Sequence, residues 1–101
     1  MLAGMAGEAY TTQLEEFAAN YWAPDLMVRQ AVVALDERQD GEPVTRVVLL
    51  LNDPTGDTWG VDRVRELRQE LGRRATTLGL PPVSLTLVPE SEAELVEAFA
   101  D

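Results

Sequence analysis

The fold is decided by the stretch Val44–Pro89, VTRVVLLLNDPTGDTWGVDRVRELRQELGRRATTLGLPPVSLTLVP. Its apolar run, residues 47–51, has no polar alternation, which is typical of a strand buried on both faces. A loop over residues 52–58 leads to a helix predicted from about Trp59 to Leu78, and residues 83–88 form a second predicted strand. A strand, a crossover helix and another strand make a βαβ unit with parallel strands. We therefore expect residues 47–51 to lie in the middle of a sheet.

The long helix is predicted by its apolar face. Steps of three or four separate the apolar residues Val61, Val64, Leu67, Leu71, Ala75 and Leu78. Gly72 lies inside this helix, where glycine costs about 1 kcal/mol relative to alanine. Gly79, followed by Leu80 and Pro81-Pro82, is typical of a left-handed cap with an apolar fold-back and a stop. The pattern thus predicts both the helix and the return of the chain toward the sheet.

The N-terminal part predicts a helix after a short tail. Residues 1–7 are small and glycine-rich, and we expect a disordered tail there. A helix is expected from about Glu8 to Trp22, because the aromatic and leucine side chains between them share one face. This helix has to end near Ala23, since Pro24 disfavours helical backbone in the residue before it.

Residues 26–35 are open to two interpretations. Their valines favour a strand, whereas Pro24-Asp25 could begin a second helix. The turn dipeptide Asp40-Gly41 lies between this segment and the strong strand that follows, and we therefore predict a hairpin. At the other end, Ser91 and Glu94 have capping-box spacing and predict a final short helix to about Phe99.

These segments predict an α+β fold in one small domain, residues 1–101, with the order α-β-β-α-β-α. The expected sheet is mixed and three-stranded, because a hairpin is joined to a βαβ crossover, and the helices pack on it. The outer edges of so small a sheet would be open, and formation of a homodimer is one way to cover them.

The composition excludes several kinds of chemistry. The chain of 101 residues has no cysteine, histidine or lysine, since all eight basic residues are arginine. Thiolate metal sites, imidazole bases and Schiff-base lysines are therefore absent. The formal net charge of −10 disfavours nucleic acid and anionic membrane surfaces, and is compatible with a basic protein partner. No apolar stretch approaches membrane-spanning length and no signal peptide is visible, so a cytoplasmic protein is expected.

One loop has a geometry that suits a ligand. The candidate ligand-binding residues are Asp53, Thr55, Gly56, Asp57 and Thr58. They follow the carboxyl end of the central strand and precede a helix, where ligands of α/β sheets bind. The aspartates could hold a hard cation, and the threonines could contact a phosphate. The alternative is structural, since these residues are also ordinary turn formers and Asp57 or Thr58 could cap the helix.

Aromatic residues give a second candidate site. Tyr21 and Trp22 end the first helix, and Trp59 lies in the loop before the long helix. Exposed aromatic side chains anchor many protein partners. The alternative is that these three side chains close the core.

The sequence supports two hypotheses about function. The first is a non-enzymatic domain that binds a protein partner, associates with itself, or does both. The alternative is a small metal- or phosphate-binding domain, or a minimal hydrolase, that uses the Asp53–Asp57 loop. No catalytic residue, metal site or cofactor is assigned.

Overall fold

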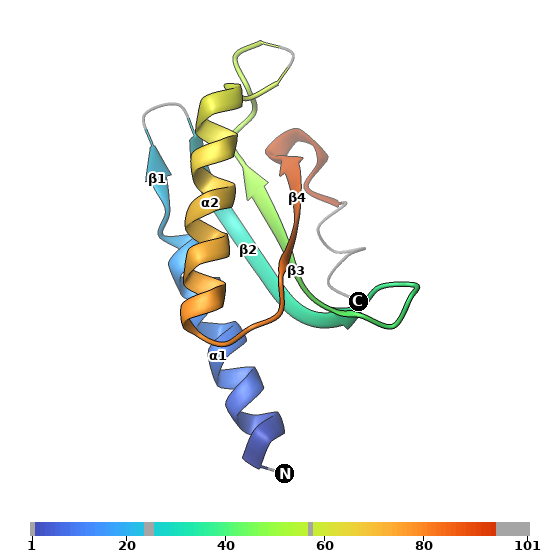
Figure 1. The fold of residues 1–101 in the computed structure, drawn as a ribbon. Helices are drawn as coiled ribbons and strands as arrows, with labels where there is room; N and C mark the ends of the chain where they lie inside the picture. Colours follow the sequence, from blue (N-terminus) through green and yellow to red (C-terminus); the bar gives the residue numbers. More distant parts are fainter. Residues whose placement is uncertain (1, 24–25, 57, 95–101) are drawn as a thin grey trace.

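The computed structural model describes residues 2–23, 26–56 and 58–94. The elements in chain order are α1 (Leu2–Ala19), β1 (Trp22–Ala23), β2 (Leu26–Glu37), β3 (Pro43–Leu51), α2 (Val61–Thr77), β4 (Val83–Pro89) and the 3-10 helix η1 (Glu90–Glu92) (Figure 1). The fold is α+β, with two α-helices and one mixed sheet.

The sheet has four strands in the order β1-β2-β3-β4. The first two pairings are antiparallel, and β3 and β4 are parallel, with α2 as the crossover. The prediction of three strands is wrong by one, because it does not include β1. Only Trp22 and Ala23 form β1, paired with Met27 and Leu26. Two residues are too few to show periodicity, and the proline that follows pushes the preceding backbone toward an extended conformation.

The central position of β3 is confirmed. It lies between β2 and β4, and residues 47–51 are all buried. Alternate residues of a strand face opposite sides of the sheet. Val47, Leu49 and Leu51 belong to the main core with the helices, whereas Val48 and Leu50 form a small cluster with Val88. The absence of polar residues in this strand therefore follows from burial on both faces.

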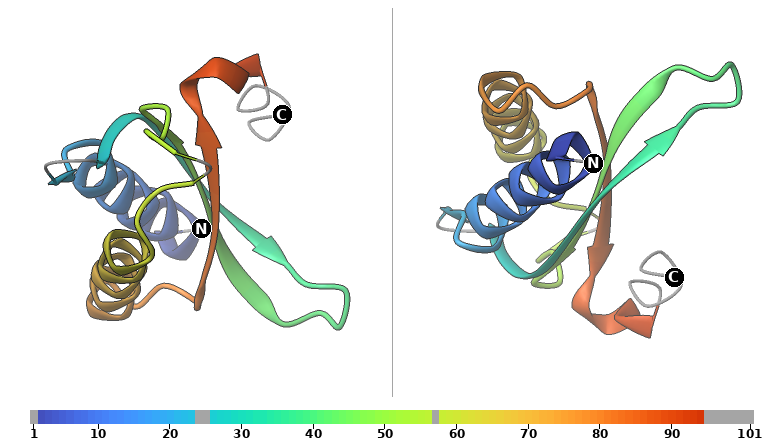
Figure 2. Two further views of the ribbon diagram at one scale, coloured as in Figure 1. Left: turned by 90° about the horizontal axis from the view of Figure 1, so that it is seen from above. Right: turned by 90° about the horizontal axis from the view of Figure 1, so that it is seen from below.

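Both helices pack on the same face of the sheet (Figure 2). Leu14 and Ala18 of α1, together with Leu67, Leu71 and Ala75 of α2, are the buried helical residues of the main core. Leu14 and the three α2 residues belong to the apolar faces that the sequence predicts, whereas the predicted face of the first helix does not include Ala18. Two residues of the predicted faces are exceptions. Val61, the first residue of α2, is 68% exposed, and Tyr10 of α1 is 41% exposed.

The hairpin prediction for β2 and β3 is confirmed, and residues 26–35 form a strand rather than a helix. Its turn has Gly41 at φ 86, the left-handed conformation that glycine tolerates, with the Gly41 N–H donating to the Arg38 carbonyl. The arm formed by this hairpin projects away from the helices (Figure 2).

The helix boundaries differ from the prediction at three ends. Helix α1 begins at Leu2 instead of Glu8 and ends at Ala19, so it extends over residues 2–7, where the sequence predicts a tail. Leucine, methionine and alanine in this segment are strong helix formers and outweigh its two glycines. Helix α2 begins at Val61 after Gly60, so Thr58 does not cap it.

The end of α2 follows the prediction. Gly79 has φ 76, its N–H donates to the Thr76 carbonyl, and the Leu80 N–H donates to the Ala75 carbonyl. These two hydrogen bonds define the Schellman motif, in which glycine accepts the left-handed position. Leu80 packs against the main core, and the chain then enters β4.

The predicted C-terminal helix lies only partly within the described residues. The chain forms η1 directly after β4, with Pro89 rather than Ser91 before its first residue and no side-chain cap. The predicted continuation to Phe99 lies outside the part of the chain that the structure describes. Within the described part, no helix combines the length and apolarity needed to cross a membrane.

Candidate functional site

The start of the loop that the sequence singles out is held by structural hydrogen bonds. The Asn52 carbonyl accepts from Trp59 Nε1 at 2.8 Å, and Asn52 Oδ1 accepts from the Met27 N–H at 2.7 Å. Asp53 Oδ1 accepts from the Ser91 N–H at 3.0 Å, and the Asp53 N–H donates to the Glu90 carboxylate at 3.2 Å. The loop therefore ties the end of β3 to the start of β2 and to the end of β4.

The remaining candidate ligand residues are not brought into a cluster. Thr55, Gly56 and Thr58 are exposed, and Asp57 lies outside the described residues. Across the described ranges, no group of three or more acidic side chains is arranged to hold a metal ion. The ligand-binding role of this loop stays a prediction. The hydrogen bonds of Asp53 support a structural role for this residue.

The three aromatic candidates occupy different environments. Trp59 is half-buried against the main core with its indole N–H bonded to Asn52, as the structural alternative expects. Tyr21 also packs against the core. Burial and the nearby carboxylates of Glu66 and Glu70 raise the pKa of Tyr21, and the Arg63 guanidinium partly offsets this effect. Trp22 is 66% exposed on β1 and is the aromatic candidate most accessible to a partner.

The structure adds a candidate that the sequence reasoning missed, the outer edge of β4. The Thr45 N–H donates to the Pro82 carbonyl at 2.8 Å, and Thr45 is the register partner of Val83. In a parallel ladder this bond fixes which residues of β4 face β3. Because N–H and C=O directions alternate along a strand, Val83, Leu85 and Leu87 direct their backbone groups away from β3. Among the described residues, β4 pairs with β3 alone.

The β4 edge carries no charge. No residue from Ala75 to Pro89 is ionisable, although 26% of the chain is charged. The opposite edge of the sheet is different. The two residues of β1 pair only with Leu26 and Met27, and the rest of β2 contains Arg29, Asp36 and Glu37. The Glu15 carboxylate also accepts from the Val33 N–H of β2 at 3.1 Å. Charges and covering side chains are how proteins protect sheet edges from pairing. The two edges are thus protected to different degrees, and β4 is the one without charges.

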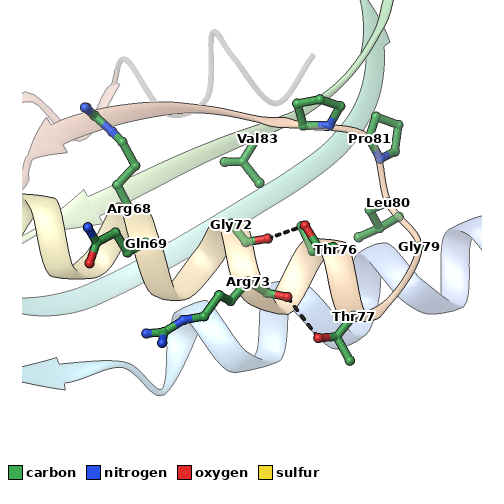
Figure 3. A pocket seen from close by; sticks show the side chains of 12 residues that line it. Arg68, Gln69, Gly72, Arg73, Thr76, Thr77, Gly79, Leu80, Pro81 and Val83 are labelled. Carbon is green, nitrogen blue, oxygen red and sulfur yellow. Dashed lines mark hydrogen bonds between the residues drawn. The ribbon is translucent and has the colours of Figure 1, made fainter.

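A groove runs between α2 and the beginning of β4 (Figure 3). Its volume is about 950 Å³, and it is lined by Arg68, Gln69, Gly72, Arg73, Ala75, Thr76, Thr77, Gly79, Leu80, Pro81, Pro82 and Val83. Arg68, Gly72 and Thr76 are four residues apart and therefore line one side of α2. A Cβ atom added at Gly72 would meet no atom within 4 Å, so this glycine leaves the helix side open.

Gly72→Ala should stabilise the protein. Gly72 has no positive φ and lies in the interior of α2, so alanine fits the backbone and reduces the entropy of the unfolded chain. We expect the free energy of unfolding to rise by about 0.5–1 kcal/mol. Urea denaturation of the two proteins measures it. Gly79→Ala is the matched control and should destabilise, because Gly79 has φ 76; an equal gain at both positions would contradict the argument.

Comparison with protein-family models, with curated proteins and with solved structures finds no match for this chain. One signal for the candidate site was visible in the sequence, namely the absence of charge from Ala75 to Pro89. This absence of charge indicates an unprotected sheet edge only if β4 is an outer strand, and the strand order shows that it is.

Proposed function

We propose that this chain is a non-enzymatic protein-binding module that pairs an extended segment of another chain with the open edge of β4. The observation that carries the proposal is the row of outward-facing backbone groups on Val83, Leu85 and Leu87, in a strand without charges. Addition of a strand to a sheet edge is a common mode of protein recognition, in which main-chain hydrogen bonds supply affinity.

The neighbouring surface supports this choice of edge. The groove between α2 and β4 lies beside the strand and has an apolar floor that includes Leu80 and Val83. Side chains of an added strand alternate between the two sides of the sheet, and those on the helix side would enter this groove. Backbone pairing and side-chain burial would therefore act together. The remainder of the acidic surface is expected to favour basic partners during encounter.

The alternative, a metal- or phosphate-binding domain, has less support. Both backbone and side-chain groups of Asp53 already make hydrogen bonds with η1, and no described acidic cluster lies beside it. A cation would have to compete with these bonds.

Amide hydrogen exchange tests the proposed function. In the dilute chain, the amides of Val83, Leu85 and Leu87 should exchange rapidly, whereas those of Ser84, Thr86 and Val88 should be protected by β3. Peptides selected from a random displayed library, or an increase in protein concentration, should slow the first set and leave the second unchanged. NMR of the ¹⁵N-labelled chain resolves this alternation residue by residue.

Two outcomes would overturn the proposal. One is that the outward amides of β4 are already protected in the dilute monomer, which would mean that the edge is covered. The other is that every selected peptide perturbs amides away from β4, for example around Trp22, which would move the binding site to β1.

A further inference from the structure

We infer that the segment bound at the β4 edge carries an acidic side chain among apolar residues, and that Arg68 binds its carboxylate in the groove between α2 and β4. This inference rests on the proposed function and identifies the chemistry of the partner. The occupant is an extended peptide segment of another protein.

Space for such a segment exists on the helix side of the new strand. Neighbouring strands lie about 4.8 Å apart, so an added strand would run along the outside of β4, beneath the flank of α2 that bears Arg68 and Gly72. Gly72 contributes no side chain, and the floor at Val83 and Leu80 is apolar. In Figure 3, the Arg68 side chain extends from α2 at one end of this groove, and Leu80 and Pro81 lie at the other end.

Arg68 differs from the other arginines of α2 because, among the described residues, its side chain is assigned neither an ion pair nor a ring contact. The Arg63 guanidinium lies 3.6 Å from the Glu66 carboxylate, and the Arg65 guanidinium lies 3.9 Å from the Asp62 carboxylate. Arg73 forms an ion pair with Glu70. Arg74 stacks over the Phe17 ring, 4.4 Å from its centre. Among the described residues, no acidic group is placed within ion-pair distance of Arg68, and the strand beside it is uncharged.

The charge of the helix supports an acidic rather than a basic ligand at this position. Helix α2 has five of the eight arginines of the chain and only three acidic residues. The lining of the groove includes Arg68 and Arg73 and no acidic residue, so its surface is locally positive in a protein of net charge −10. A carboxylate beside Arg68 would gain a charge-assisted hydrogen bond, whereas a lysine there would face a like charge.

A second copy of the chain fits the groove less well than a peptide. If β4 paired with β4 of a second copy about a two-fold axis, the same surface would lie on both sides of the dimer interface. Two chains of net charge −10 would repel each other at low ionic strength. Self-pairing is therefore an outcome that the experiment has to distinguish.

The experiment is selection of a random displayed peptide library on three proteins, namely wild type, Arg68→Gln and Arg65→Gln. The Arg65 variant is the matched control, because Arg65 is exposed on the same helix, pairs with Asp62 and does not line the groove. We expect peptides rich in β-branched residues, with one aspartate or glutamate, from wild type and Arg65→Gln. That acidic preference should be absent from the Arg68→Gln selection.

Individual peptides then give the size of the effect. Fluorescence anisotropy should show that replacing the acidic residue of a selected peptide by its amide weakens binding to wild type about fivefold, as for a partly exposed ion pair. The same replacement should have no effect on binding to Arg68→Gln.

The outcomes separate this inference from the proposed function. Peptides that protect the β4 amides but show no acidic preference overturn the inference and leave the proposed function intact. No peptide protecting β4 overturns both. A concentration-dependent dimer that protects β4 while no peptide is enriched identifies a second copy as the occupant, and that result also overturns the inference.

Discussion

Leu49→Ala should lower the free energy of unfolding by about 3 kcal/mol, within the 2–5 kcal/mol usual for a buried leucine. Leu49 lies in the middle of β3, its side chain is 0% exposed, and it belongs to the main core between the sheet and the two helices. Its removal leaves a cavity at a position where β2 and β4 flank the strand on both sides, so the surrounding backbone cannot collapse easily. For a domain of this size, the melting temperature should fall by roughly 12–24 °C.

Leu35→Ala is the control for this substitution. Leu35 lies on β2, near the far end of the hairpin, and its side chain is 51% exposed. The same leucine-to-alanine change there should cost less than about 1 kcal/mol, because less apolar surface is removed from burial. Urea denaturation of both variants gives the comparison. Equal losses at the two positions would contradict the central, two-faced burial of β3.

Thr45→Val should cost about 1–2 kcal/mol, although valine has nearly the same shape as threonine and suits a strand. Thr45 is the only buried polar residue of the described core, with its side chain 0% exposed. Its Oγ1 donates to the Pro81 carbonyl at 2.8 Å, and its N–H donates to the adjacent Pro82 carbonyl. Loss of the hydroxyl would leave the Pro81 carbonyl without its donor, and an unpaired buried acceptor is costly.

Thr86→Val is the matched control. Thr86 lies on β4, the neighbouring strand, and no side-chain hydrogen bond involves it among the described residues. The same replacement there should change the free energy of unfolding by less than about 0.5 kcal/mol. Thermal or urea unfolding of both variants decides the question. A neutral Thr45→Val would show that the Pro81 carbonyl does not depend on this hydroxyl.

The parts of the fold that the sequence predicts are those with strong local patterns. The uninterrupted apolar run of β3, the three-and-four spacing of α2 and the Gly79 cap each depend on chemistry within a few residues, and the structure confirms them. The predicted start of α2 is two residues too early. The Trp59 indole bonds to Asn52 across the loop and holds that segment outside the helix, which no local pattern shows.

The candidate site was harder to predict because it depends on strand order. The loop after β3 was selected by a general rule about strand ends, but Asp53 there is used to bind η1. The edge of β4 becomes visible only when the sheet order places β4 outermost. Likewise, sequence spacing alone does not show that Arg63, Arg65 and Arg73 form ion pairs while Arg68 is assigned none among the described residues.

The parallel pairing of β3 and β4 also sets the order in which the chain can fold. The turn at Gly41 closes the β2–β3 hairpin locally, whereas the partners Thr45 and Val83 are separated by the whole of α2. Contacts between residues distant in sequence form late, because a long loop has to close first. We expect one edge of the apolar strand β3 to stay unpaired until β4 has formed. The folding chain therefore passes through an intermediate that is prone to aggregation.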